Sequence, residues 1–243
     1  MIKKLLVDRW ALHLDAYTLN RYRLISPFLL KGSIHSLNVG TGGGVETLRL
    51  LRRGNRVTIL EIDTNTAAKT SSRITRNGYS DRFTCLTGHF LKTEVPDTFG
   101  LVMMCEVLEH IKDDAGTIAK LATLITKGGR LILSTPTASY GLMDGDTVVS
   151  DEDPQHPEYH VRAGYDGPEL DKMLVAAGFK VETRILNGYI LMQYYHLLER
   201  NLRRFNFLMP LSLFVSLVGR IIAPILELVK IKPSNQVTIA TRV

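Results

Sequence analysis

Short apolar runs alternate with helical stretches along most of the chain. The runs are rich in residues that favour strands, whereas the stretches between them repeat apolar residues at helical spacing. This alternation is typical of βαβ units, which pair their strands in parallel. Strands are therefore predicted at residues 36–39, 56–62, 82–88, 100–106, 129–135, 179–186 and 236–243, with helices in most of the gaps.

The stretch from Asn187 to Lys232 departs from this rhythm. It contains a basic cluster, "ERNLRRF", followed by 13 residues without a charge, Phe207 to Gly219. Spanning a bilayer takes about 20 apolar residues, and Arg220, Pro224 and Glu227 interrupt the continuation. Two interpretations stay open: an interfacial hairpin on an anionic membrane, or a pair of helices that caps a pocket or forms a dimer face.

The chain of 243 residues, 45% of them hydrophobic, is long enough for one large core. We predict an N-terminal helical cap at 1–33, a core at 34–186, a helical apolar insertion at 187–232 and the last strand of the core at 233–243. Charged residues near the start argue for an amphipathic helix there and against a signal peptide.

A net charge of +6 and a pI of about 9.3 fit an anionic partner. The basic residues gather at 21–23, 51–56 and 199–205, and the first two groups are expected to be solvated helix faces. No aromatic motif of the RNA-binding type accompanies them, which disfavours nucleic acid. Cys85 and Cys105 lie in apolar runs without CxxC spacing, so neither a disulfide framework nor a zinc site is indicated and a cytoplasmic location is expected.

Four glycines follow the first predicted strand: Gly40, Gly42, Gly43 and Gly44. They precede a helix, so they lie where open α/β sheets bind ligands. Glu61 ends the second strand, where a carboxylate can accept hydrogen bonds from both hydroxyls of a ribose. The spacing fits neither GxGxxG nor a P-loop, which excludes the usual dinucleotide and triphosphate motifs. A different nucleoside cofactor is indicated.

Five segments in succession resemble a class I S-adenosylmethionine-dependent methyltransferase of the small-molecule group with the LEH motif. They read "LNVGTGGG", "ILEID", "FGLVMMCEVLEHIKD", "LITKGGRLILSTPT" and "HVRAGYDGPELDKMLVAAGFKVE", and they cover residues 34–186. The resemblance implies a Rossmann-like α/β fold: a seven-stranded, mostly parallel sheet with helices on both faces and an antiparallel last strand. The cofactor it implies is S-adenosyl-L-methionine.

By this resemblance, the glycine loop would lie against the methionine part of the cofactor, Glu61 would hold the ribose, and the segment after the third strand would surround the adenine. Asn38 and His89 stand where family members usually have acidic residues. An amide oxygen or an imidazole can still accept a hydrogen bond there, without the negative charge. The residues predicted to bind the cofactor are Asn38, Gly40, Thr41, Gly42, Gly44, Glu61, Ile62, Gly88, His89, Phe90 and Cys105.

Candidate catalytic residues follow the fourth strand. Glu106, Glu109 and His110 would share one face if this segment turned helical. Three interpretations stay open. Glu106 closes the cofactor pocket while His110 packs locally; His110 or His160 is a general base; or the three residues, with His156 or His160, hold a divalent metal. The third resembles the metal site of ubiquinone-pathway O-methyltransferases and RNA-terminal ribose methyltransferases, although metal-independent relatives also contain LEH.

The segment between Ser134 and Asp166 is long for a connection and resembles an active-site lid. Its acidic residues are expected to face solvent. His156, Tyr159 and His160 are its candidate functional residues.

The predicted function is methyl transfer from S-adenosylmethionine to an oxygen of a small or lipid-linked acceptor, with Glu106, His110 and His160 as catalytic candidates. The alternatives are a metal-dependent sugar or RNA-terminal ribose O-methyltransferase and a non-catalytic binding module of the same fold. The sequence leaves a metal undecided. A homodimer and peripheral attachment to an anionic membrane remain open.

Overall fold

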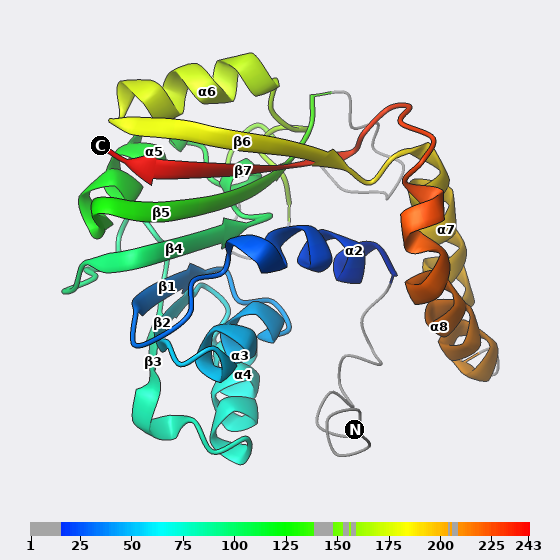
Figure 1. The fold of residues 1–243 in the computed structure, drawn as a ribbon, viewed down its shortest axis with the longest axis horizontal. Coiled ribbons are helices and arrows are strands. Elements are labelled where there is room, and N and C mark those ends of the chain that lie inside the picture. The colour runs from blue at the N-terminus through cyan, green and yellow to red at the C-terminus, as the bar shows by residue number, and fades with distance from the viewer. Residues whose placement is uncertain (1–15, 139–147, 153–155, 157–158, 204, 206–208) are drawn as a thin grey trace.

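A seven-stranded sheet forms the centre of the molecule (Figure 1). The structure is a computed structural model that describes residues 16–138, 148–152, 156, 159–203, 205 and 209–243. Its strands are β1 (His35–Val39), β2 (Arg56–Glu61), β3 (Phe83–Thr87), β4 (Phe99–Cys105), β5 (Ile125–Pro136), β6 (Phe179–Asn187) and β7 (Asn235–Arg242). All seven predicted strands are present, with the largest difference at β5, which begins at Ile125.

The strands lie in the order β3-β2-β1-β4-β5-β7-β6. Neighbours from β3 to β5 pair in parallel, whereas β7 is antiparallel to both β5 and β6. The chain order reverses beside β1, because β2 lies on one side of it and β4 on the other. Open α/β sheets bind their ligands at such a point, outside the carboxyl ends of the strands. The predicted fold class is confirmed.

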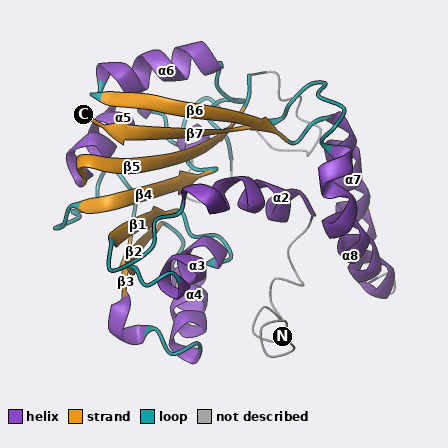
Figure 2. Ribbon diagram, viewed as in Figure 1, coloured by secondary structure: helices purple, strands orange, loops and turns teal. Residues whose placement is uncertain are grey.

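Helices cover both faces of the sheet (Figure 2). Leu101 and Met103 pack with residues of one helical layer, whereas Val102 and Met104 between them pack with the other. This alternation follows from the two-residue period of a strand, and four apolar residues in a row mark a strand buried on both faces. The first layer consists of α2 (Ala16–Ile25), α3 (Val45–Arg52) and α4 (Thr64–Arg76), and the second of α5 (Asp114–Leu124) and α6 (Gly167–Ala176).

The insertion folds as a helical hairpin of α7 (Ile190–Arg203) and α8 (Met209–Leu226). Met192 of α7 and Ala223 of α8 are buried together, and the Tyr195 hydroxyl donates a hydrogen bond to the Val215 carbonyl. Both helices also contact α2. No helix among the described residues is long and apolar enough to cross a membrane. The short helices η2 (Ser26–Phe28), η3 (Ser80–Arg82) and η4 (Leu108–His110) complete the fold.

The structure leaves the predicted division into segments untested. The first strand begins at His35, and the hairpin lies within the predicted insertion. Residues 1–15, where an amphipathic helix is predicted, lie outside the described residues. Both cysteines are free thiols, as the absence of CxxC spacing indicates.

Glu227, just after α8, links the hairpin to the sheet. Its Oε1 accepts a hydrogen bond from the Gly188 amide at 3.1 Å, at the start of the hairpin. Burial raises the pKa of this carboxyl from 4.5 to about 7, against the opposing effect of hydrogen bonds from the Gly188 and Tyr189 backbone. The folded protein therefore holds this proton more tightly than the unfolded chain does.

We expect the hairpin to be most stable in mild acid. The folded pKa lies above the unfolded one, so this contribution is complete below pH 4.5 and is lost as pH rises to about 7. Solvent screens the half-buried carboxyl, which reduces the expected loss to about 1 kcal/mol. Hydrogen exchange of α7 and α8 at pH 5 and pH 8 measures this loss of stability. Glu227→Gln keeps the acceptor without the charge and should flatten this dependence; an equal pH dependence in the variant would contradict the assignment.

Candidate functional site

A cavity of about 530 Å³ lies at the carboxyl ends of β1, β2 and β4. Its walls come from the glycine loop after β1, the ends of β2 and β4, the loop after β3, helix α2 and the segment between β5 and α6. The volume is in the range of pockets that bind drug-sized ligands. The cavity occupies the place that the strand order predicts for a ligand.

The glycine loop is shaped by steric limits. Gly40 has a φ of 69°, and a Cβ there would lie 2.2 Å from the Val107 Cγ2 atom. Gly44 has a φ of 72°, and a Cβ there would lie 2.9 Å from the Thr70 Cγ2 atom. A side chain at either position would meet both a disfavoured backbone and a close neighbour. The glycines thus bring β1, α4 and the segment after β4 close together.

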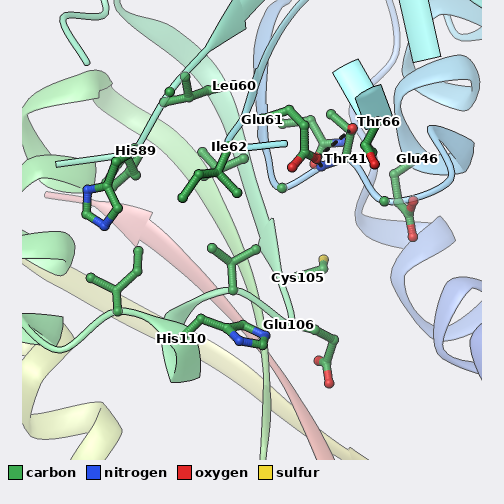
Figure 3. Close-up of a pocket in the computed structure, with 18 of the residues that line it drawn as sticks. Thr41, Glu46, Leu60, Glu61, Ile62, Thr66, His89, Cys105, Glu106 and His110 are labelled. Carbon is green, nitrogen blue, oxygen red and sulfur yellow. Dashed lines mark hydrogen bonds between the residues drawn. The ribbon is translucent and has the colours of Figure 1, made fainter. Parts of the chain in front are cut away.

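Glu61 closes the cavity at the end of β2 and is 6% exposed. Its Oε2 accepts hydrogen bonds from the Thr41 amide at 2.8 Å and from the Thr41 hydroxyl at 3.0 Å (Figure 3). Its Oε1 accepts one from the Asp63 amide at 3.2 Å. A carboxylate has about four acceptor positions, so it can still accept a hydrogen bond from a ligand. Glu61 therefore fixes the glycine loop and faces the cavity at once.

Asn38 lies on β1 and is 2% exposed. Its Nδ2 donates a hydrogen bond to the Thr47 hydroxyl at 2.9 Å. This bond uses one of the two amide hydrogens, and Oδ1 is the acceptor of the side chain. Cys105, at the end of β4, also lines the cavity. Burial raises the pKa of its thiol, so the side chain is a neutral wall residue and not a thiolate nucleophile.

His89 and Glu152 meet across the cavity wall, 63 positions apart in the sequence numbering. The His89 Nε2 atom lies 3.0 Å from the Glu152 Oε2 atom. The other Glu152 oxygen accepts a hydrogen bond from the Lys112 amide at 2.7 Å. The expectation that the acidic residues of this segment face solvent is therefore wrong for Glu152. The pairing holds the His89 ring in one orientation, with Nδ1 buried and without a hydrogen-bond partner among the described residues.

Glu106 is held by residues of two strands and a helix. Its Oε1 accepts hydrogen bonds from the Ser134 hydroxyl at 2.5 Å and from the Asn235 amide group at 2.7 Å. The Arg21 guanidinium lies 3.6 Å from the same oxygen. Glu106 has a φ of 54°, a disfavoured conformation for a residue with a side chain. The buried polar contacts offset this cost and fix the carboxylate at the cavity wall.

The predicted common face of Glu106, Glu109 and His110 is not present. Glu106 precedes a single helical turn, η4, and its left-handed backbone turns its side chain away from the other two. Glu109 is fully buried and forms a group with His110 and His160, whose potential ligand atoms lie within 4.8 Å of one another. The predicted metal set is corrected accordingly: Glu106 and His156 are not part of this group.

His110 is fixed by a contact from the lid segment. Its Nδ1 lies 3.0 Å from the Tyr159 carbonyl oxygen, which can only accept a hydrogen bond. A neutral His110 therefore has its proton on Nδ1 and a lone pair on Nε2. The ring of His160 packs edge to face on it at a centroid distance of 4.6 Å. His160 is 8% exposed and lies behind His110, outside the cavity lining.

The structure brings most of the predicted site residues together. The cavity lining includes Asn38, Gly40, Thr41, Gly42, Glu61, Ile62, Gly88, His89, Phe90, Cys105, Glu106 and His110. Gly44 and His160 are not part of the lining. Gly44 ends the loop and begins α3, and His160 packs behind His110. His156 and Tyr159 line the cavity, with their rings stacked at 4.7 Å.

Sequence reasoning missed Arg21 and Glu152. Arg21 belongs to a basic group expected to be solvated, yet its side chain is 12% exposed and lines the cavity. Its neighbour Arg23 is exposed, so the expectation holds for only part of the group. Helical spacing offers a signal for Arg21, because the buried Tyr22 and Ile25 place the adjoining face of α2 against the core. No local pattern indicates Glu152.

Residues 37–133 match the family model described as a methyltransferase domain. The ubiquinone biosynthesis O-methyltransferase of Aeromonas salmonicida (strain A449) is 29% identical over 99 residues, which are 41% of this chain and 42% of that protein. The chain thus matches curated relatives over about two fifths of their length.

Solved structures extend the similarity to most of the chain. An S-adenosylmethionine-dependent methyltransferase from Mesorhizobium loti has a TM-score of 0.62 and 14% identity, over 95% of this chain and all of that one. The [4+2]-cyclase SpnF has a TM-score of 0.60 and 17% identity, over 88% of this chain and 76% of its own. At these identities the similarity shows the fold alone.

Proposed function

Because residues 37–133 form a methyltransferase domain and the chain has the class I S-adenosylmethionine-dependent methyltransferase fold, we propose that it transfers a methyl group from S-adenosylmethionine to an acceptor oxygen. The observation behind this proposal is the cavity at the switch point of the sheet, bordered by the glycine loop, Glu61 and His110. The fold also accommodates a cyclase, so the reaction is argued from the site and not from the fold.

The residues present fit this cofactor. Glu61 offers carboxylate oxygens for ribose hydroxyls, and Asn38 offers Oδ1 for the amino group of the methionine part. Arg21 offers a guanidinium for a carboxylate. The three side chains come from β2, β1 and α2, so a bound cofactor would be held from several directions.

The chain has His89 in the loop after β3, where an acidic residue is usual, and Glu152 brings a carboxylate to this histidine. Glu152 can only accept when ionised, so a neutral His89 donates from Nε2 and keeps its lone pair on Nδ1. That buried Nδ1 has no hydrogen-bond partner among the described residues, and we propose that it accepts from the exocyclic amine of adenine once the cofactor is bound. We propose that a histidine oriented by Glu152 replaces the usual carboxylate at this position.

His110 is the proposed general base. S-adenosylmethionine supplies a methyl group activated by its sulfonium, which passes to the acceptor oxygen as the carbon–sulfur bond breaks. His110 accepts the hydroxyl proton at Nε2, while the Tyr159 carbonyl holds the proton on Nδ1 and fixes the ring.

The acceptor is proposed to be a small or lipid-linked hydroxyl compound, and the chain to attach peripherally to a membrane. The O-methyltransferase named among the relatives supports oxygen as the methyl acceptor. The apolar hairpin beside the cavity end of the sheet supports a lipid-linked compound.

A labelling experiment tests this function. The chain is incubated with S-adenosylmethionine bearing a deuterated methyl group, together with a lipid extract or a water-soluble extract of cells. We expect mass spectrometry to find a deuterated O-methyl product, enriched in the lipid extract. Binding of S-adenosylmethionine without a labelled product in either extract would favour the non-catalytic binding module.

A metal-dependent O-methyltransferase is the second candidate, because Glu109, His110 and His160 come together in one buried group. A hard divalent ion would there orient an acceptor with neighbouring hydroxyls. We expect the general-base mechanism to persist in a chelator. Activity lost in EDTA and restored by Mg²⁺ would instead favour the metal, and Glu109→Gln, which removes one charged ligand, should then weaken Mg²⁺ binding measured by calorimetry.

A further inference from the structure

Helix α8 presents its large apolar side chains to the outside. Leu211, Phe214, Leu217, Ile221 and Ile225 are between 47% and 73% exposed. Their spacing of three or four residues places them along one face of the helix. On the opposite face, the small residues Ser212, Ser216, Gly219 and Ala223 are all buried. A helix of a water-soluble protein normally has the reverse arrangement, with its large apolar residues inside.

Further large apolar side chains are exposed on α7 and after α8. On α7, Leu191, Tyr194 and Leu198 are 39% to 55% exposed at the same helical spacing. After α8, Leu228 and Ile231 are 71% and 54% exposed. We call this set, with the five residues of α8, the outer hairpin face. Contiguous exposed apolar surfaces of this kind mark contact sites, whereas single exposed apolar residues need no explanation.

Most charged residues of the hairpin are basic. Between residues 187 and 232 the acidic residues are Glu199 and Glu227, and the basic ones are Arg200, Arg203, Arg204, Arg220, Lys230 and Lys232. Glu199 is fully buried, and Glu227 accepts a hydrogen bond from the Gly188 amide. Lys230 and Lys232 are exposed next to the outer hairpin face. The charged groups that the described residues of the hairpin expose are therefore cationic.

We propose that the outer hairpin face docks onto an anionic lipid membrane. Exposed apolar side chains bordered by cations fit the boundary between headgroups and acyl chains. A second copy of this chain fits less well, because an isologous contact would bring two surfaces of the same positive charge together. No helix among the described residues is long and apolar enough to cross the membrane. The proposed docking is peripheral.

The docking surface lies at the cavity end of the molecule. Figure 1 shows the hairpin beyond the ends toward which β4 and β6 point. Helix α2 contacts both helices of the hairpin and contributes Arg21 to the cavity wall. This inference rests on the proposed function, because it names an anionic lipid membrane as the partner for the membrane attachment proposed there. A lipid-linked acceptor requires both the docking surface and the methyl-transfer site.

Vesicle flotation tests the surface directly. We expect the chain to float with vesicles of phosphatidylcholine and phosphatidylglycerol, and to bind less as salt is raised. Phe214→Asp combined with Ile221→Asp should reduce binding at least tenfold, because charges then enter the apolar layer. Val175→Asp is the matched control: Val175 is 60% exposed on α6, outside the hairpin, and its replacement should leave binding unchanged.

A second pair of substitutions tests the contribution of the basic side chains to vesicle binding. Lys230→Glu combined with Lys232→Glu should weaken binding to these vesicles about tenfold or more. Lys127→Glu, an exposed lysine at the start of β5, is its control and should have little effect.

Circular dichroism establishes that the variants fold. A folded wild-type chain that stays unbound to these vesicles would overturn the proposal, as would a stable dimer in sedimentation that Phe214→Asp with Ile221→Asp dissociates. Methyl transfer is assayed separately with a detergent-solubilised acceptor, so a failure of docking is distinguishable from a failure of the proposed reaction.

Discussion

Replacing His110 by alanine is expected to lower the methyl-transfer rate about a hundredfold or more, the usual contribution of a positioned general base. The reason is the hydrogen bond between His110 Nδ1 and the Tyr159 carbonyl, which leaves the lone pair on Nε2 at the cavity wall. Without the imidazole, the acceptor hydroxyl must lose its proton to water or to a group that is less well placed. Single-turnover kinetics with labelled S-adenosylmethionine measures this step.

The His110→Ala variant should bind S-adenosylmethionine as the wild type does, because the proposed cofactor contacts come from other residues. His156→Ala is the matched control: His156 lines the same cavity, with its ring stacked on Tyr159, and its loss should cost much less. Full activity of His110→Ala would exclude it as the base.

Replacing Glu61 by alanine is expected to weaken S-adenosylmethionine binding by about 1.5–3 kcal/mol, the range for hydrogen bonds to charged groups. This corresponds to roughly 10- to 150-fold in the dissociation constant. Two effects act together. The carboxylate that would accept the ribose hydroxyls is lost, and the Thr41 amide and hydroxyl lose the acceptor that fixes the glycine loop. Isothermal titration calorimetry measures the affinity.

Two further substitutions serve as a control and as a comparison for the loss of affinity in Glu61→Ala. Glu94→Ala removes an exposed carboxylate that is not part of the cavity lining and should leave the affinity unchanged. His89→Ala removes one proposed hydrogen bond to adenine and should cost about 0.5–1.5 kcal/mol, less than Glu61→Ala. Unchanged affinity in Glu61→Ala would refute the ribose assignment.

Residues that act within one short segment were predictable. The glycine loop and the acidic end of β2 follow directly from two apolar strands, and the backbone limits on glycine hold wherever the loop lies. The expected common face of Glu106, Glu109 and His110 is absent for a local reason. It requires helical spacing, whereas the chain forms one turn of η4 after Glu106, a left-handed residue. A buried network from β5 and β7 stabilises that conformation, and spacing alone does not include it.

The order of strands and helices, the position of the cavity, and the residues that reach it from the ends of β1, β2 and β4 follow from the amino-acid pattern alone. These depend on periodicity and on the meeting of strand ends at one edge of a sheet. The three-dimensional packing was needed to show that Arg21 lines the cavity, that Glu152 orients His89 and that the Tyr159 carbonyl fixes the proton of His110. The packing of the hairpin likewise leaves Phe214, Leu217 and Ile221 of α8 exposed and buries its Ser212, Ser216 and Gly219. Each of these contacts joins residues far apart in the chain, and their meeting depends on how helices and loops pack on the sheet, which no local pattern encodes.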